Sequence, residues 1–126
     1  MPDLGYRENV MGPQPIGKVV VPPPAMLEAF DALMSALLRG DRDAAEAITE
    51  AQALDDLKRV EGAIAPGGYD KYELIGRARI AEHFFSKVRL VGPIPLTIQF
   101  RFGKNGDRWT VREVTDLTGR RSGWSK

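Results

Sequence analysis

The chain of 126 residues contains no cysteine and a single histidine, His83. The absence of cysteine excludes a disulfide scaffold, a thiolate metal site and a cysteine nucleophile. A single histidine excludes a metal site made of several imidazoles, so any histidine acid–base chemistry depends on His83 alone. We therefore expect neither a metal ion nor a cofactor.

The sequence also lacks an apolar run of about 18 residues, the length that spans a membrane. Its first residues, MPDLGYREN, show no signal-peptide pattern. These two absences predict a cytoplasmic protein. The apolar fraction of 43% and the charged fraction of 28% are those of an ordinary globular protein, and the length suits one domain.

Proline is concentrated in the first 25 residues, which hold six of the nine prolines. Because proline lacks an N–H donor and fixes φ, this segment is predicted to be an arm rather than a helix or a central strand. We therefore divide the chain into an arm (1–25), a domain (26–118) and a short tail (119–126).

The formal net charge of +1 is a cancellation between two halves of the chain. Residues 26–70 hold ten acidic and four basic side chains, a balance of −6, and residues 71–126 hold five acidic and twelve basic ones, a balance of +7. This division indicates one acidic and one basic surface. Domains that bind nucleic acid are usually strongly basic as a whole, so we disfavour nucleic acid as a partner.

The polar side chains between residues 25 and 39 form one narrow stripe at helical spacing. This pattern predicts a helix buried over most of its circumference. Gly40 is expected to end it, and Asp41 to cap the next helix. That second helix either reaches Val60 or divides in two, with Asp55 or Asp56 capping the second piece.

From Tyr69 onward the apolar period changes to two, which is typical of strands. The stretch 74–90 is too long for one strand, so a bend, bulge or break is expected near Ala81–Phe85. Further strands are predicted over 96–102 and from Trp109. Helices followed by such a meander predict an α+β fold, with two or three N-terminal helices packed on a curved antiparallel sheet of about four strands.

Alternation along these strands divides their side chains between two faces. The apolar face, which includes Val88, Leu90 and Val111, is expected to meet the helices. The opposite face is polar and basic, and it forms a candidate interaction face made of Arg77, Arg79, Lys87, Arg89, Arg101 and Arg112.

Two segments, LLRGDRDAA between the helices and QFRFGKNGDRWTVREVTD at the end of the sheet, resemble the nuclear transport factor 2-like superfamily. Ketosteroid isomerases, scytalone dehydratase and polyketide cyclases belong to it. The resemblance covers about residues 26–118 and implies a conical α+β fold, a pocket between the concave sheet face and the helices, and frequently a homodimer. The sequence departs from the family where only residues 54–69 replace a strand pair and a further helix, so the cone would be small or its mouth differently covered.

The resemblance implies that an apolar small molecule occupies that pocket. Tyr69 and Tyr72 follow a Pro-Gly-Gly stretch, and they either flank the mouth of the pocket or are half-buried residues at the end of a strand. The candidate ligand-binding residues come from the predicted apolar face and its rim. They are Tyr72, Phe84, Ser86, Ile98, Phe100, Trp109 and Thr115.

Two carboxylates, Glu82 and Glu113, fall on the apolar face by strand alternation. A carboxylate that faces an apolar interior is costly unless it is paired or protonated, and in the resembled enzymes such acids transfer protons on apolar substrates. Alternatively, a bulge near Ala81 sends Glu82 outward and Glu113 pairs with an arginine. His83 falls on the opposite face, where we expect a surface or interface residue unless a register break turns it inward.

Three functions remain open from the sequence. The first is a small pocket-bearing domain that binds an apolar small molecule. The second is a non-enzymatic interaction or assembly module that uses the basic face. The third is an acid–base enzyme of the isomerase or lyase type that uses carboxylates. Because no complete acid–base constellation is visible, we favour a domain without an established catalytic set.

Overall fold

The computed structural model describes residues 20–119, so most of the predicted arm and nearly all of the predicted tail lie outside the described residues. The helices are α1 (Pro24–Leu38), α2 (Arg42–Ala47), the short 3-10 helix η1 (Ala51–Ala53) and α3 (Leu54–Ile64). The strands are β3 (Lys71–Ile80), β4 (His83–Val91), β5 (Leu96–Asn105) and β6 (Arg108–Asp116). Helices followed by an antiparallel sheet confirm the predicted α+β class.

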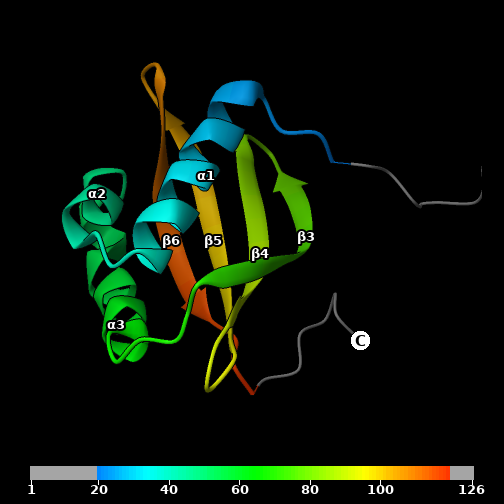
Figure 1. Cartoon of the computed structure of the whole chain (residues 1–126). Coiled ribbons are helices and arrows are strands. Elements are labelled where there is room, and N and C mark those ends of the chain that lie inside the picture. The colour runs from blue at the N-terminus through cyan, green and yellow to red at the C-terminus, as the bar shows by residue number, and fades with distance from the viewer. Residues whose placement is uncertain (1–19, 120–126) are drawn as a thin grey trace, which may run out of the picture.

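The four strands form one antiparallel sheet in the order β3-β4-β5-β6, so each strand pairs with its neighbour in sequence. Figure 1 shows α1 lying across one face of this sheet, with α2 and α3 beyond β6. The segment after α2 joins the edge of β6, because the Val111 N–H donates to the Ile48 carbonyl (2.8 Å) and the Glu50 N–H donates to the Val111 carbonyl (2.9 Å). Within residues 20–119 no helix has the length and apolar character needed to cross a membrane.

Helix α1 begins at Pro24, within the segment predicted to be a non-helical arm. Proline is tolerated at this first position because the first N–H groups of a helix have no partner inside it. The helix ends where predicted, since Gly40 takes a φ of +74° and reverses the chain. The Asp41 side chain then accepts a hydrogen bond from the Ala44 N–H (3.1 Å) and caps α2.

The second helical stretch is divided into two pieces, one of the two alternatives that the sequence left open. Helix α2 ends at Ala47, and the residues that follow it pair with β6 instead. Helix α3 continues past the predicted end at Val60 to Ile64. Asp55 and Asp56 lie in its first turn, where negative charge favours the helix N-terminus, but neither of them caps it.

The core lies between α1 and the facing side of the sheet. The Phe30 ring of α1 meets the rings of Tyr72 and Phe102 edge-on, at centroid distances of 5.7 and 6.2 Å. Edge-on aromatic contacts add to the free energy that burial of the rings itself provides. Most of the strand residues predicted to meet the helices are fully buried, among them Val88, Leu90, Ile98, Phe100 and Val111, whereas Trp109 and Leu117 are partly buried.

A bulge in β3 changes which of its side chains face the helices. The pairing with β4 shifts between Leu74 and Gly76, so Ile75 is the extra residue. Every later side chain of β3 therefore lies on the face opposite to that predicted by strict alternation. The predicted break near Ala81–Phe85 is present as a turn at Ala81 and Glu82, where Ala81 has a φ of 57°.

A second bulge, in β6, has the same effect at the opposite edge of the sheet. Arg101 pairs with Glu113 and Phe102 with Val111, so Arg112 is the extra residue. Residues of β6 that follow it have changed face. As a result Val114, not Glu113, is buried opposite Phe100.

Glu50 connects the helical layer to the β5–β6 hairpin. Its Oε2 accepts hydrogen bonds from the Thr110 hydroxyl (2.5 Å) and from the Asn105 side-chain amide (3.4 Å). The Arg112 Nε lies 3.6 Å from the same oxygen. The Thr110 hydroxyl, with these further groups, holds the pKa of Glu50 below its usual value.

Replacing Thr110 by valine keeps the side-chain shape but removes the main donor to Glu50. We expect the free energy of unfolding at neutral pH to fall by about 1–2 kcal/mol, measured by denaturant titration. Because the pKa of Glu50 is lowered in the folded state, this stabilisation is present above the unfolded pKa and is lost as the pH falls through the folded pKa. The difference between the two proteins should therefore shrink in acid.

The matched control is Glu113→Gln, which breaks an ion pair whose carboxylate side chain is 53% exposed. We expect it to change the free energy of unfolding by less than about 0.5 kcal/mol. An equally small effect of Thr110→Val would show that the Glu50 contact does not hold the two layers together.

Candidate functional site

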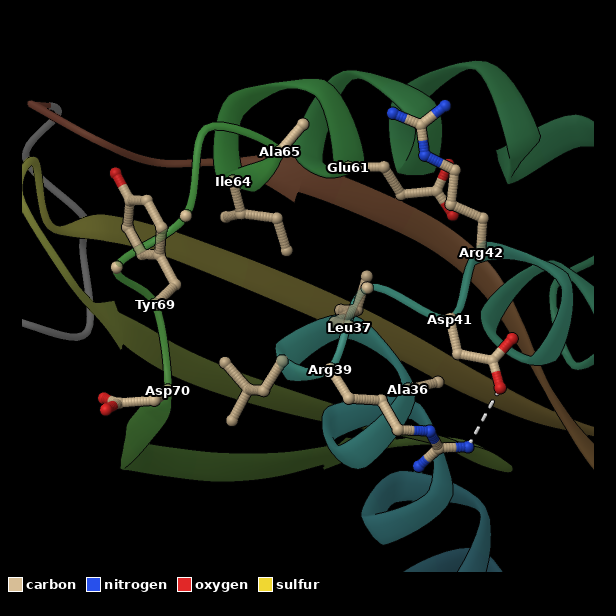
Figure 2. A pocket seen from close by; sticks show the side chains of 14 residues that line it. Ala36, Leu37, Arg39, Asp41, Arg42, Glu61, Ile64, Ala65, Tyr69 and Asp70 are labelled. Carbon is tan, nitrogen blue, oxygen red and sulfur yellow. Dashed lines mark hydrogen bonds and ion pairs between the residues drawn. The ribbon is translucent and has the colours of Figure 1, made fainter.

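A cavity of about 510 Å³ opens at the end of the helical layer. It lies between the end of α1, the end of α3 and the chain that leads into β3, and Figure 2 shows side chains from all three segments around it. Pockets that hold small molecules commonly measure about 300–1,000 Å³. The apolar side chains of the lining are Ala36, Leu37, Leu38, Ile64, Ala65 and Tyr69, and the charged ones are Arg39, Asp41, Arg42, Glu61 and Asp70.

The segments around the cavity change direction at glycines. Helix α1 stops at Leu38, and the chain then reverses at Gly40. After α3 the chain passes through Gly68, which has a φ of +90°. A Cβ at that position would lie 2.9 Å from the Pro93 side chain, so the close approach of the two segments requires glycine.

Tyr69 forms a fixed wall of the cavity. Its hydroxyl donates to the Ile94 carbonyl (2.7 Å) and accepts from the Ile94 N–H (3.3 Å). Its ring lies so close to Gly92 that a Cβ there would come within 2.3 Å of it. Tyr69 thus lines the cavity, whereas Tyr72 packs on Phe30 in the core.

Two of the charged groups at the cavity are paired with each other. Arg39 donates to the Asp41 carboxylate (3.1 Å) and to the Ser35 hydroxyl (2.5 Å), and the first contact is drawn in Figure 2. The Ala44 N–H and the Arg39 guanidinium hold the pKa of Asp41 below its usual value. Arg39 and Asp41 therefore stabilise the turn between α1 and α2.

Glu61 of α3 is the buried acid of the cavity, with 4% of its surface exposed. Burial raises the pKa of Glu61 to about 7, and the neighbouring Glu46 carboxyl acts in the same direction through its charge and through the hydrogen bond that a protonated Glu61 donates to it. Arg42 and Lys58 act in the opposite direction. Within residues 20–119 no donor lies within hydrogen-bond distance of the Glu61 Oε2.

Sequence reasoning missed Glu61, although a signal for it was present. Glu61 follows Leu57 by four residues and precedes Ile64 by three, so all three lie on one face of a helix. That face is the buried one. An acid at a core-facing helical position is as unusual as one on an apolar strand face, and it marks a candidate functional residue in the same way.

Both carboxylates predicted on the apolar strand face lie elsewhere. Glu82 is exposed in the turn between β3 and β4. Glu113 lies on the outer side of the sheet because of the bulge at Arg112, and its Oε1 is 3.4 Å from the Arg101 Nε. The expectation that they face the interior is wrong. The alternative is correct for Glu113, which lies outward beside an arginine, while Glu82 points outward from a turn and not from a bulge. Thr115 pairs with Gln99 and has changed face for the same reason.

The other candidate ligand-binding residues lie in the core or at its border. Phe84, Ser86, Ile98 and Phe100 are buried, as strand alternation predicted. Trp109 is partly buried against the Phe84 ring, with the centroids 5.8 Å apart. These residues, like Tyr72 and Thr115, are not among those that line the 510 Å³ cavity, and their contact with a ligand stays a prediction.

The candidate interaction face is divided by the bulge in β3. Arg77 and Arg79 were predicted to face outward and instead face the helices, where their guanidinium groups lie 4.7 Å from the Phe30 ring centroid and 5.8 Å from the Phe84 ring centroid. This prediction is wrong because alternation reverses after Ile75. The four cations on the outer side are Lys87, Arg89, Arg101 and Arg112, but Lys87 is buried, contrary to its predicted place on an exposed face.

The outer cations have partners within the chain. Arg89 makes an ion pair with Glu73 (3.2 Å), and Arg112 donates to the Lys104 carbonyl (2.9 Å). His83 is half-buried next to Gly103 and Arg112, on the same outer side. In the described part of the chain, no group of three or more acidic or imidazole side chains is placed to hold a metal ion.

Comparison with known proteins identifies the fold. No protein-family model and no curated protein matches the sequence. A DUF4783 family protein from Bacteroides ovatus has a similar structure, with a TM-score of 0.57 and 7% identity over 68% of this chain and 90% of that one.

Two proteins of unknown function that are described as nuclear transport factor 2-like are also similar. The one from Shewanella baltica has a TM-score of 0.56 and 13% identity over 71% of this chain and 87% of that one. The one from Shewanella oneidensis has a TM-score of 0.51 and 12% identity over 73% and 95%. The chain therefore has the nuclear transport factor 2-like fold, as its sequence resemblance predicted.

Replacing Glu61 by glutamine tests the buried acid. Because the folded pKa of Glu61 is raised to about 7, its ionisation opposes folding, and the stability of the protein falls as the pH rises from the unfolded pKa to the folded pKa. Glu61→Gln removes this loss. We expect the variant to be more stable than the original protein above about pH 7, by up to about 3 kcal/mol, with a smaller difference in acid.

The measurement is a series of denaturant titrations across this pH range. The control is Glu28→Gln on the exposed side of α1, which makes the same change of side chain away from the cavity. A Glu61→Gln difference that stays constant from acid to alkaline pH would contradict a raised pKa.

Proposed function

We propose that this protein binds a small molecule with an apolar body in the cavity between α1, α3 and the start of β3. The observation that carries the proposal is the cavity itself, which combines apolar side chains from three segments with one buried acid. Small-molecule sites are commonly mostly apolar hollows with a few polar groups that fix orientation. The shared fold alone would not support this proposal, because one fold serves many functions.

The lining supports binding to a preformed site. Leu37 and Ile64 offer apolar surface from two different helices, and Tyr69 offers a ring that two hydrogen bonds hold in place. A wall that is already ordered loses little conformational freedom when a ligand binds. Glu61 then supplies a polar contact, and the exposed arginines and Asp70 stand at the rim.

We propose binding rather than catalysis as the activity. A carboxyl with a pKa near 7 would suit proton transfer, and Glu61 meets that requirement. The acids that the sequence suggested for such chemistry, Glu82 and Glu113, lie in the turn between β3 and β4 and on the outer sheet side. The proposed role of Glu61 is therefore to contact the ligand.

Filling the cavity tests this proposal. Ala65 is exposed and lines the cavity, so Ala65→Trp should occupy the space without disturbing the core. The matched control is Ala63→Trp, two positions earlier, where an exposed alanine does not belong to the lining. The probes are 1-hexanol and cyclohexanol, followed by changes in backbone amide NMR shifts.

We expect both probes to cause saturable shifts at the cavity in the original protein and in Ala63→Trp. In Ala65→Trp the affinity should fall by at least about tenfold, because a bulky ring occupies the site. The absence of saturable shifts in the original protein, or equal affinity in the two variants, would contradict the proposal.

A second candidate function is self-association through β3. This strand lies at one edge of the sheet, and it exposes Leu74 (44%), Ile75 (40%) and Ile80 (64%). Edge strands with apolar side chains favour pairing with another chain. The arginines of the outer face support assembly less well, because Arg89 and Arg101 already face carboxylates of their own chain.

Light scattering over a range of protein concentrations tests this second candidate. We expect a mass near that of a dimer for the original protein and near that of a monomer for Ile80→Lys, because a charge on the edge strand opposes pairing. The control is Ile94→Lys, at an equally exposed position in the β4–β5 loop (68%), which should keep the dimer mass. A monomer mass for the original protein at every concentration would exclude the candidate.

A further inference from the structure

We infer that the ligand of this cavity carries a protonated amine, with its ammonium group against Glu61 and its apolar part against Leu37, Ile64 and Tyr69. The inference rests on the proposed small-molecule binding and adds the chemical class of the ligand. Two independent observations support it, one on Glu61 itself and one on the charges around it.

The first observation is that Glu61 is buried and that one of its carboxylate oxygens, Oε2, lacks a donor from the described residues. Only 4% of the residue is exposed, and its Oε2 has no hydrogen-bond partner among residues 20–119. A buried polar group normally has a partner, and a buried carboxylate without one is unfavourable. An ammonium group supplies three donors and the opposite charge, so it satisfies this oxygen better than a neutral hydroxyl does.

The second observation is the charge around Glu61. Helix α2 contributes Glu46 and Arg42, and α3 itself contributes Lys58. Asp70, just before β3, lines the cavity at the end away from Glu61 (Figure 2). Arg42 lies next to Glu61 in Figure 2, but it is exposed and forms no ion pair with Glu61 in the described part of the chain.

The remaining pair at the cavity, Arg39 and Asp41, is already joined. Without that pair, the lining of the cavity holds two acids, Glu61 and Asp70, and one base, Arg42. This balance favours a cation over an anion.

The ionisation of Glu61 predicts how the affinity for an amine changes with pH. Burial and Glu46 raise the pKa of Glu61 to about 7, and a bound ammonium group lowers it again. An amine should therefore bind more tightly as the pH rises through about 7, with release of a proton. A carboxylate ligand would need Glu61 protonated and should show the opposite dependence.

The experiment is isothermal titration calorimetry of the full chain with three probes that share one alkyl chain, namely n-hexylamine, 1-hexanol and hexanoate. We expect hexylamine to bind about tenfold more tightly than hexanol at about pH 8. Its affinity should rise by about tenfold between about pH 6 and pH 8, and titrations in two buffers of different ionisation enthalpy should show release of about half a proton near pH 7.

Two variants separate a direct contact from a structural role. Glu61→Gln should reduce the hexylamine affinity to that of hexanol and abolish its pH dependence, while leaving hexanol binding unchanged. Arg42→Gln removes the competing cation, so it should strengthen hexylamine binding and weaken hexanoate binding. A merely structural role of Glu61 would change the affinity for all three probes together.

The other possible results also decide whether the ligand is an amine. If hexanol binds and hexylamine binds no more tightly, or if hexanoate binds best and favours acid, the amine inference is wrong and the proposed cavity function stands. If none of the three probes binds, both the proposed function and the inference are overturned.

Discussion

The burial of one sheet face beneath helix α1 is the interaction on which the rest of this structure depends. Phe30 of α1 contacts rings on β3 and β5, and Phe100 and Phe102 are fully excluded from water. Because α1 ends at Leu38 and the chain then turns toward the edge of β6, the helical layer stops before it reaches the start of β3. The cavity is the space left at that end, so its walls are set by helix termini and loops.

The fold could be predicted from the sequence because its main determinants are local. The stripe of polar residues on α1, the stop at Gly40 and the cap at Asp41 each depend on a few neighbouring residues. The faces of the strands could be predicted only up to each bulge. One extra residue, Ile75 or Arg112, reverses every later side chain. Gly76, beside Ile75, is a residue that often marks a bulge inside a strand, but no such residue lies beside Arg112.

The site was harder to predict than the fold, for a physical reason. The resemblance directed attention to carboxylates on strands, and strict alternation then placed Glu82 and Glu113 inside. The cavity instead depends on the distances between the ends of α1, α3 and the start of β3, which no short-range pattern encodes. Glu61 was within reach of sequence reasoning, since its spacing from Leu57 and Ile64 places it on the buried face of α3.

The central claim is that Glu61, a buried carboxyl with a raised pKa, faces a cavity that binds a small molecule. The most direct measurement is a carbon-13 NMR titration of the Glu61 side-chain carboxyl, with and without n-hexylamine. The account predicts a midpoint near pH 7 for Glu61 in the free protein, and a shift of that midpoint to lower pH with the amine. A Glu61 midpoint near the ordinary value of 4.5, unchanged by the amine, would contradict it.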